Sequence, residues 1–202
     1  MATLVQIESA DRQLLAEMAA TMAEAARRSG EWLACRIGCT QCCIGPFGIT
    51  QLDALRLRRG MEELERVDLV RAAAVRARAD AYVERIAAIY PGDARTGELF
   101  EEDDLPESMD ELPCPALDPT TGACELYDAR PITCRSFGQA TRIGDDRLAA
   151  CELCYVGASD AEIAACAVEL DADGIEAGLV EALEARGVKG MTIVAYAVAH
   201  AL

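Results

Sequence analysis

The chain has 202 residues, of which 52% are hydrophobic and 4% aromatic, and a formal net charge of -16 at pH 7. This length suits one domain with a buried core, and abundant alanine with few rings favours closely packed helices, so we expect a mostly α fold in a single domain, 1–202. The acidity argues against binding nucleic acid, whose phosphates need clustered Lys and Arg, and against anionic membrane surfaces.

Residues 1–30 predict an N-terminal helix that ends at Gly30. Its apolar side chains recur with helical spacing and should face the core rather than a metal. The start of the chain has no basic region leading into an apolar stretch, so we expect no signal peptide and a reducing, cytoplasmic location. The helical stripe consists of Leu14, Leu15, Met18, Met22 and Ala25.

Residues 50–90 predict a helical insertion. Thr50 and Asp53 form a capping pair that begins a helix, and Gly60 is expected to end it. The apolar spacing after Gly60 predicts one long helix or two shorter ones, which stop at the Pro91–Gly92 pair.

The segment 98–113 is rich in acidic side chains, and its spacing does not match an EF-hand. We therefore expect a solvated acidic loop. Further on, residues 139–143 and 147–151 are expected to pair as a short hairpin across 144–146.

Residues 159–202 predict C-terminal helices. Ser159 and Glu162 have the spacing of a capping box, which begins the first of these helices. A final helical pair is expected, broken at Gly187, with its second member running from Met191 to the end. That apolar stretch is too short to span a bilayer.

The ten cysteines are the most informative feature of the chain. Thiolates are soft ligands that select zinc, copper(I) or iron–sulfur clusters, whereas disulfide frameworks belong mostly to short secreted chains. We therefore expect an irregular, cysteine-rich metal-binding core over 35–155, flanked by helices, with Cys166 as a buried helix residue outside it. The candidate ligands are Cys35, Cys39, Cys42, Cys43, Cys114, Cys124, Cys134, Cys151 and Cys154.

Cys42 and Cys43 are adjacent, and neighbouring side chains diverge in most backbone conformations. Both thiols on one zinc ion would be strained, which favours a polynuclear cluster or two nearby sites. Eight thiols could form two four-ligand sites or one cluster with spare thiols. One of the two thiols could instead simply be buried. The adjacent pair is one of two reasons to prefer iron–sulfur over zinc, which is kept as the alternative.

The run Cys39-Thr-Gln-Cys42-Cys43, the tetrapeptide Cys114-Pro-Ala-Leu and the stretch from Cys124 to Phe137 resemble the YkgJ-type cysteine-cluster family, also called CxxCxxCC. The resemblance covers well over half of the chain and implies a zinc- or iron-chelating thiolate centre, for which a 4Fe–4S cluster is expected. The first spacing departs from the usual Cys-x-x-Cys, because three residues separate Cys35 from Cys39. Flagellin lysine N-methylases look like relatives of this cluster.

Arg130 and Arg135 flank Cys134 and are candidate cofactor-binding residues. They could offset thiolate charge or bind an anionic substrate, or they could pair with the acidic loop. No nucleotide-binding or nucleophile motif is present, so the residues themselves predict no reaction. We expect a metal-binding protein with a structural or electron-transfer role; the alternatives are a lysine methylase-like transferase and a zinc storage or delivery protein. Metal ions are the expected partners, and a protein partner or substrate stays open.

Overall fold

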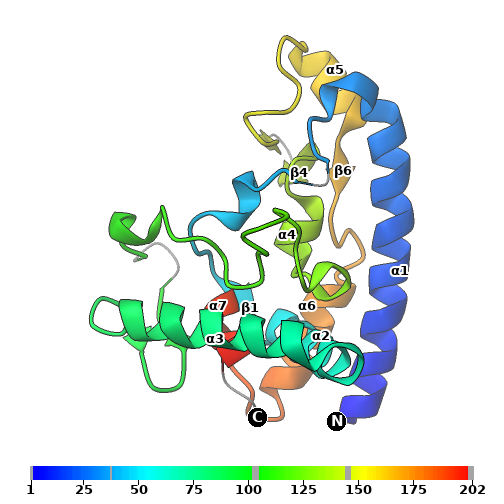
Figure 1. The fold of residues 1–202 in the computed structure, drawn as a ribbon. Helices are drawn as coiled ribbons and strands as arrows, with labels where there is room; N and C mark the ends of the chain where they lie inside the picture. The colour runs from blue at the N-terminus through cyan, green and yellow to red at the C-terminus, as the bar shows by residue number, and fades with distance from the viewer. Residues whose placement is uncertain (1, 37, 102–104, 144–146, 200–202) are drawn as a thin grey trace. The chain divides into compact units, whose positions relative to one another are not determined.

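A computed structural model of the chain describes residues 2–36, 38–101, 105–143 and 147–199. The fold is mostly α-helical, as predicted, with short strands between the helices (Figure 1). The chain divides into two compact units. Unit 1 comprises Met1–Arg36 and Thr133–Arg186, and unit 2 comprises Ile37–Ile132 and Gly187–Leu202.

Unit 1 is built on helix α1 (Leu4–Ser29), which begins at a capping box. Gln6 N donates to Thr3 Oγ1 at 3.3 Å, and Thr3 N donates to Gln6 Oε1 at 2.8 Å. The helix ends at Gly30, whose φ of +51° suits glycine, so the predicted end is confirmed. The predicted stripe is also confirmed: Leu14, Met18 and Ala25 are buried, and Leu15 and Met22 are half-buried.

Helices α5 (Asp160–Cys166) and α6 (Ile175–Glu184) pack against α1 within unit 1. Helix α5 begins at the predicted capping box of Ser159 and Glu162. Residues Gly30–Trp32 form the short 3-10 helix η1.

The sheet of unit 1 has the strand order β5-β4-β6. Strands β4 (Thr141–Ile143) and β5 (Arg147–Ala149) are antiparallel, which confirms the predicted hairpin, although its turn at 144–146 lies outside the described residues. Strand β6 (Val168–Glu169) pairs in parallel with β4. Strand β6 was not predicted, because a strand of two residues is too short to show an alternation of apolar and polar side chains.

In unit 2, α2 (Gln51–Val67), α3 (Leu69–Ile86) and α7 (Val194–Ala199) pack on one another around a shared apolar core. Asp53 N donates to Thr50 Oγ1 at 3.1 Å, so the predicted start of α2 is confirmed. The predicted end at Gly60 is wrong, because α2 continues to Val67. A Cβ at Gly60 would clash with the Cβ of Ala129, so glycine serves a close approach here rather than a helix end.

A four-stranded antiparallel sheet completes unit 2 in the order β1-β7-β3-β2. Its strands are β1 (Ile49–Thr50), β2 (Gly92–Asp93), β3 (Glu98–Leu99) and β7 (Met191–Thr192). The expectation of a helix from Met191 onward is therefore wrong at its start, since Met191 pairs with Thr50 and Leu99 before α7 begins. Residues 200–202 lie outside the described part.

The acidic segment 98–113 has two kinds of side chain. Its described carboxylates at Glu98, Glu101, Glu107, Asp110 and Glu111 are exposed, as expected. Its apolar residues instead anchor the segment: Leu99, Met109 and Leu112 are buried with Tyr196 in one core. The segment also contains β3 and the 3-10 helix η4 (Glu107–Met109), and residues 102–104 are outside the described ranges.

No helix within the described ranges is long and apolar enough to cross a lipid bilayer.

Candidate metal centre

The first contact between cysteine segments in unit 2 is a short antiparallel pairing. Cys114 N donates to Cys43 O at 2.7 Å, and Gly45 N donates to Leu112 O at 2.9 Å. Ile44 and Pro113 form an isolated β-bridge between these two bonds. This backbone pairing brings together Cys43 and Cys114, which are 71 residues apart in the sequence.

Residues 114–124 form a second pairing, which we call the cysteine hairpin. Leu117 N donates to Cys114 O at 3.0 Å, and Leu117 and Cys124 form a β-bridge. Glu125 N donates to Ala116 O at 2.8 Å. The hairpin therefore returns Cys124 to the neighbourhood of Cys114, and both half-buried side chains pack against the unit 2 core.

Cys42 and Cys43 belong to the 3-10 helix η2 (Gln41–Cys43) and are half-buried. The Cys43 thiol donates a hydrogen bond to Cys42, which lowers the pKa of Cys42 to about 6 even though burial opposes the shift. The same hydrogen bond, together with burial, raises the pKa of Cys43. Cys42 therefore ionises more easily than Cys43, Cys114 and Cys124 in the metal-free protein.

Electrostatic interactions link this pair to the hairpin cysteines. Burial raises the pKa of Cys114 to about 12 and also raises that of Cys124. Negative charge on Cys114 or Cys124 raises the pKa of Cys43 further. Cys42, Cys43, Cys114 and Cys124 thus form one interacting set, which we call the four-thiol group.

Arg130 supplies positive charge to the four-thiol group. Its charge lowers the pKa of Cys42 and of Cys124. The guanidinium lies 3.6 Å from the ring centroid of Tyr127, and Nε donates to Tyr127 O at 2.9 Å. Arg130 therefore supplies positive charge near Cys42 and Cys124.

Cys39 lies in the loop just before η2 and is half-buried. Gly122 at the tip of the cysteine hairpin lies against this loop. A Cβ added there would be 3.5 Å from Thr40 Cγ2 and 3.6 Å from Gly38 Cα. The loop that carries Cys39 therefore packs beside the hairpin tip.

Unit 1 contains the other predicted ligands. The exposed Cys35 directs its Sγ to Phe137 O at 3.6 Å. A Cβ at Gly138 would clash with Cys35 Sγ and lie 3.7 Å from Cys154 Sγ, so both thiols are close to Gly138. Cys154 N donates to Cys151 O at 2.9 Å, in a turn whose two cysteines are buried.

Helix α4 (Ile132–Ser136) carries Cys134 and Arg135, both half-buried. Cys166, at the end of α5, is buried as predicted and shares a small core with Cys151 and Cys154. The ten cysteines, nine predicted ligands and Cys166, therefore fall five in each unit, with Cys39 and the four-thiol group in unit 2.

A buried ion pair on α2 holds the backbone at Ile132, two residues before Cys134. The sequence did not lead us to predict this contact. Asp53 Oδ1 accepts from Arg56 Nη1 at 2.6 Å and from Ile132 N at 3.1 Å. Both side chains are almost fully buried. The i,i+3 spacing of Asp53 and Arg56 on α2 could have indicated the ion pair. No sequence signal indicated the hydrogen bond from Ile132 N to Asp53.

Among the described residues, no group of three or more His, Cys, Asp or Glu side chains is arranged to hold a metal ion. The donor chemistry nevertheless fits zinc or iron, because the four-thiol group is all sulfur and both metals take thiolate ligands. The adjacent thiols of Cys42 and Cys43 would be strained on a single zinc ion and suit a polynuclear centre better. Cys42, Cys43, Cys114 and Cys124 would hold such a group.

A helical protein in which backbone pairing gathers thiols in this way falls in the class of cysteine-rich metal-chelating proteins. A family model described as "CxxCxxCC: Putative zinc- or iron-chelating domain" matches residues 34–155, which is more than half of the chain. The chain belongs to this family, as the motif spacing predicted. No curated protein and no solved structure gives a significant match.

Proposed function

We propose that the four-thiol group binds the metal of this chelating domain. The observation that carries the proposal is the double backbone pairing of residues 43–45 with 112–114 and of Leu117 with Cys124. These pairings bring sulfur ligands from two distant segments into one interacting set. Such an assembly supplies the four soft ligands that a zinc ion or an iron–sulfur cluster takes. Cys39, in the loop beside the hairpin tip, is a further candidate.

An iron–sulfur cluster, of the 4Fe–4S type, is favoured over zinc. The adjacent thiols of Cys42 and Cys43 suit a polynuclear centre better than a single ion. The positive charge of Arg130 would offset the negative charge of a thiolate centre with either metal. The role we propose is structural or electron-transferring, in a cytoplasmic protein.

Unit 1 offers a second set of candidate ligands, made of Cys35, Cys134, Cys151 and Cys154. The proximity of Cys35 and Cys154 to Gly138 supports their joint use, as does the turn that joins Cys151 to Cys154. Arg135 stands beside Cys134 and is proposed to offset charge there.

The test is to purify the full chain without oxygen and measure iron, acid-labile sulfide and zinc per chain. Iron with matching sulfide supports the cluster, and stoichiometric zinc alone supports a zinc site. A folded protein that holds neither after reconstitution overturns the proposal. Exchangeable metal in excess of a fixed stoichiometry would instead support storage or delivery.

Serine variants then assign the ligands. Cys43→Ser, Cys114→Ser and Cys124→Ser should each lower the metal content, because a metal site is coupled to the fold around it. Cys166→Ser is the matched control: it also replaces a buried thiol but should leave the metal content unchanged. Equal metal loss in the control would show that the ligand set is wrong.

A further inference from the structure

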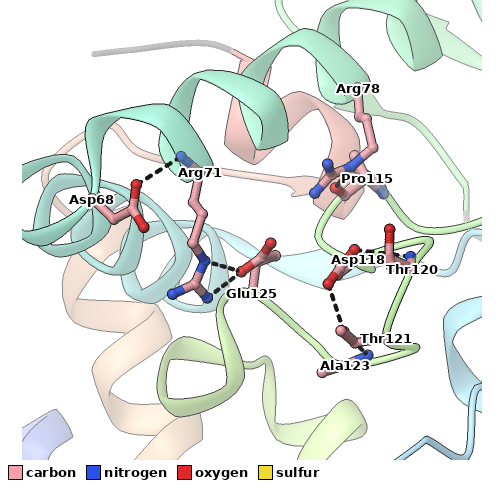
Figure 2. Close-up of polar contacts among 9 residues, drawn as sticks. All are labelled: Asp68, Arg71, Arg78, Pro115, Asp118, Thr120, Thr121, Ala123 and Glu125. Carbon is pink, nitrogen blue, oxygen red and sulfur yellow. Dashed lines mark hydrogen bonds and ion pairs between the residues drawn. The ribbon is translucent and has the colours of Figure 1, made fainter.

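Two of the proposed ligands, Cys114 and Cys124, stand at the two ends of the cysteine hairpin. The tip of this hairpin is held by its own bonds (Figure 2): Asp118 accepts from Thr120 N at 2.9 Å and from Thr121 Oγ1 at 2.6 Å. Asp118 N donates to Ala123 O at 2.8 Å and closes the turn. These contacts shape the tip only. The two arms of the hairpin, which carry Cys114 and Cys124, are fixed by contacts with the rest of unit 2.

Helix α3 contacts the first arm through Arg78. Its Nε donates to Pro115 O at 2.9 Å, on the residue immediately after Cys114 (Figure 2). A backbone carbonyl is a strong acceptor, and a guanidinium donates a charge-assisted hydrogen bond to it. Arg78 therefore restrains the backbone directly beside a proposed ligand.

The same helix contacts the second arm through Arg71. Arg71 Nε donates to Glu125 Oε2 at 2.8 Å, Arg71 Nη2 forms an ion pair with the same oxygen, and Glu125 immediately follows Cys124. The Glu125 side chain is 10% exposed and the Arg71 side chain 53% exposed, so the carboxylate is held against the protein while the guanidinium stays open to solvent. Asp68 caps this end of α3 by accepting from Arg71 N at 3.0 Å.

Arg71 and Arg78 are seven residues apart, which is close to two helical turns, so they project from the same face of α3. The helix itself is fixed by its packing on α2 and α7. One rigid helix therefore holds both arms of the hairpin, each at the residue that follows a cysteine.

We propose that Arg71 and Arg78 are positioning residues that set the separation of Cys114 and Cys124 before the metal binds. This inference rests on the proposed function of the four-thiol group. Preorganised ligands lose less conformational freedom on binding, so the arginines should raise metal affinity without contacting the metal. Residues that orient metal ligands typically contribute about 10- to 100-fold in affinity.

The test measures zinc affinity of the reduced, metal-free full chain by competition with a chromophoric chelator. The double variant R71M/R78M should bind zinc about 10- to 100-fold more weakly than the wild type. Arg76→Met is the matched control, because Arg76 lies on the same helix but pairs with Glu65 at 2.5 Å and with Val198 O at 3.1 Å. This control should bind zinc as the wild type does.

Cobalt(II) gives a second readout, which reports directly on thiolate coordination. At saturation, the R71M/R78M protein should show wild-type thiolate-to-cobalt absorption, because every cysteine is still present, while half-saturation needs more cobalt. A folded R71M/R78M protein with wild-type affinity would overturn the inference, as would an equal loss in Arg76→Met.

If R71M/R78M does not fold, the charge-swapped pair R71E/E125R replaces it. We expect it to bind zinc more tightly than R71E alone, and equal affinities would overturn the inference. The wild-type measurement keeps the two proposals apart. A wild type that binds no zinc and no cluster refutes the proposal that the four-thiol group binds metal. A variant that binds zinc as tightly as the wild type refutes only the role of the arginines.

Discussion

Replacing Asp53 with alanine should destabilise unit 2 strongly. The carboxylate accepts hydrogen bonds from Arg56 and from Ile132 N, and the side chains of Arg56 and Asp53 are only 2% and 6% exposed. Removing one partner of a buried ion pair costs about 3–5 kcal/mol. Since a whole domain is stable by only about 5–15 kcal/mol, the variant should lose a large part of its stability.

The assay is urea denaturation of the reduced, metal-free chain, followed by circular dichroism, with the free energy of unfolding taken by linear extrapolation. Asp53→Asn keeps an oxygen that can accept from Ile132 N but loses the charge, so its loss should be smaller than that of alanine. Glu63→Ala is the matched control on α2, because its ion pair with Arg66 has side chains 58% and 70% exposed. That control should lose no more than about 1 kcal/mol.

A loss in Asp53→Ala no larger than in Glu63→Ala would refute the reasoning. It would mean that the buried pair contributes little beyond its own desolvation cost.

Two further predictions concern the cysteine surroundings. In the metal-free protein the Cys42 pKa of about 6 makes Cys42 largely a thiolate at pH 7, so iodoacetamide should modify it before Cys43, Cys114 and Cys124 in peptide mapping. Cys43→Ala removes the hydrogen-bond donor, so the pKa of Cys42 should rise and the pH midpoint of its alkylation should move upward; an unchanged midpoint would contradict the assignment. In unit 1, Gly138→Ala should destabilise more than Gly157→Ala in urea. Both glycines have positive φ, +101° and +83°, but only at Gly138 would a Cβ clash with the Cys35 thiol, whereas at Gly157 it would meet nothing within 4 Å. The clash should add about 1–3 kcal/mol, and equal losses would show that the thiol moves aside freely.

Local signals in the sequence predicted the helix starts well. The capping residues Thr50 and Ser159 each begin a helix where expected, because a cap acts on backbone groups only two or three residues away. The end of α1 at Gly30 was equally local.

The predictions that were wrong depended on distant contacts. The sequence predicts a helix end at Gly60, yet Gly60 lies inside α2, at a point where Ala129 approaches it closely. Met191 was read as helical, yet it enters a strand because Thr50 and Leu99 offer pairing partners. Neither neighbour is visible in the local pattern of apolar residues.

The sequence by itself determined the chemistry of the site: its sulfur donors, their motif and the family to which they belong. These follow from residue types and short spacings, which need no folded chain. Only the tertiary structure decided which cysteine-bearing segments pair through their backbones and which contacts hold them. A backbone hydrogen bond joins Cys114 to Cys43, which lies far away in the chain. Side-chain hydrogen bonds from Arg71 and Arg78 likewise join α3 to the cysteine hairpin. Such contacts form only when packing of α2, α3 and α7 fixes the positions of those segments, and no local sequence pattern encodes those positions.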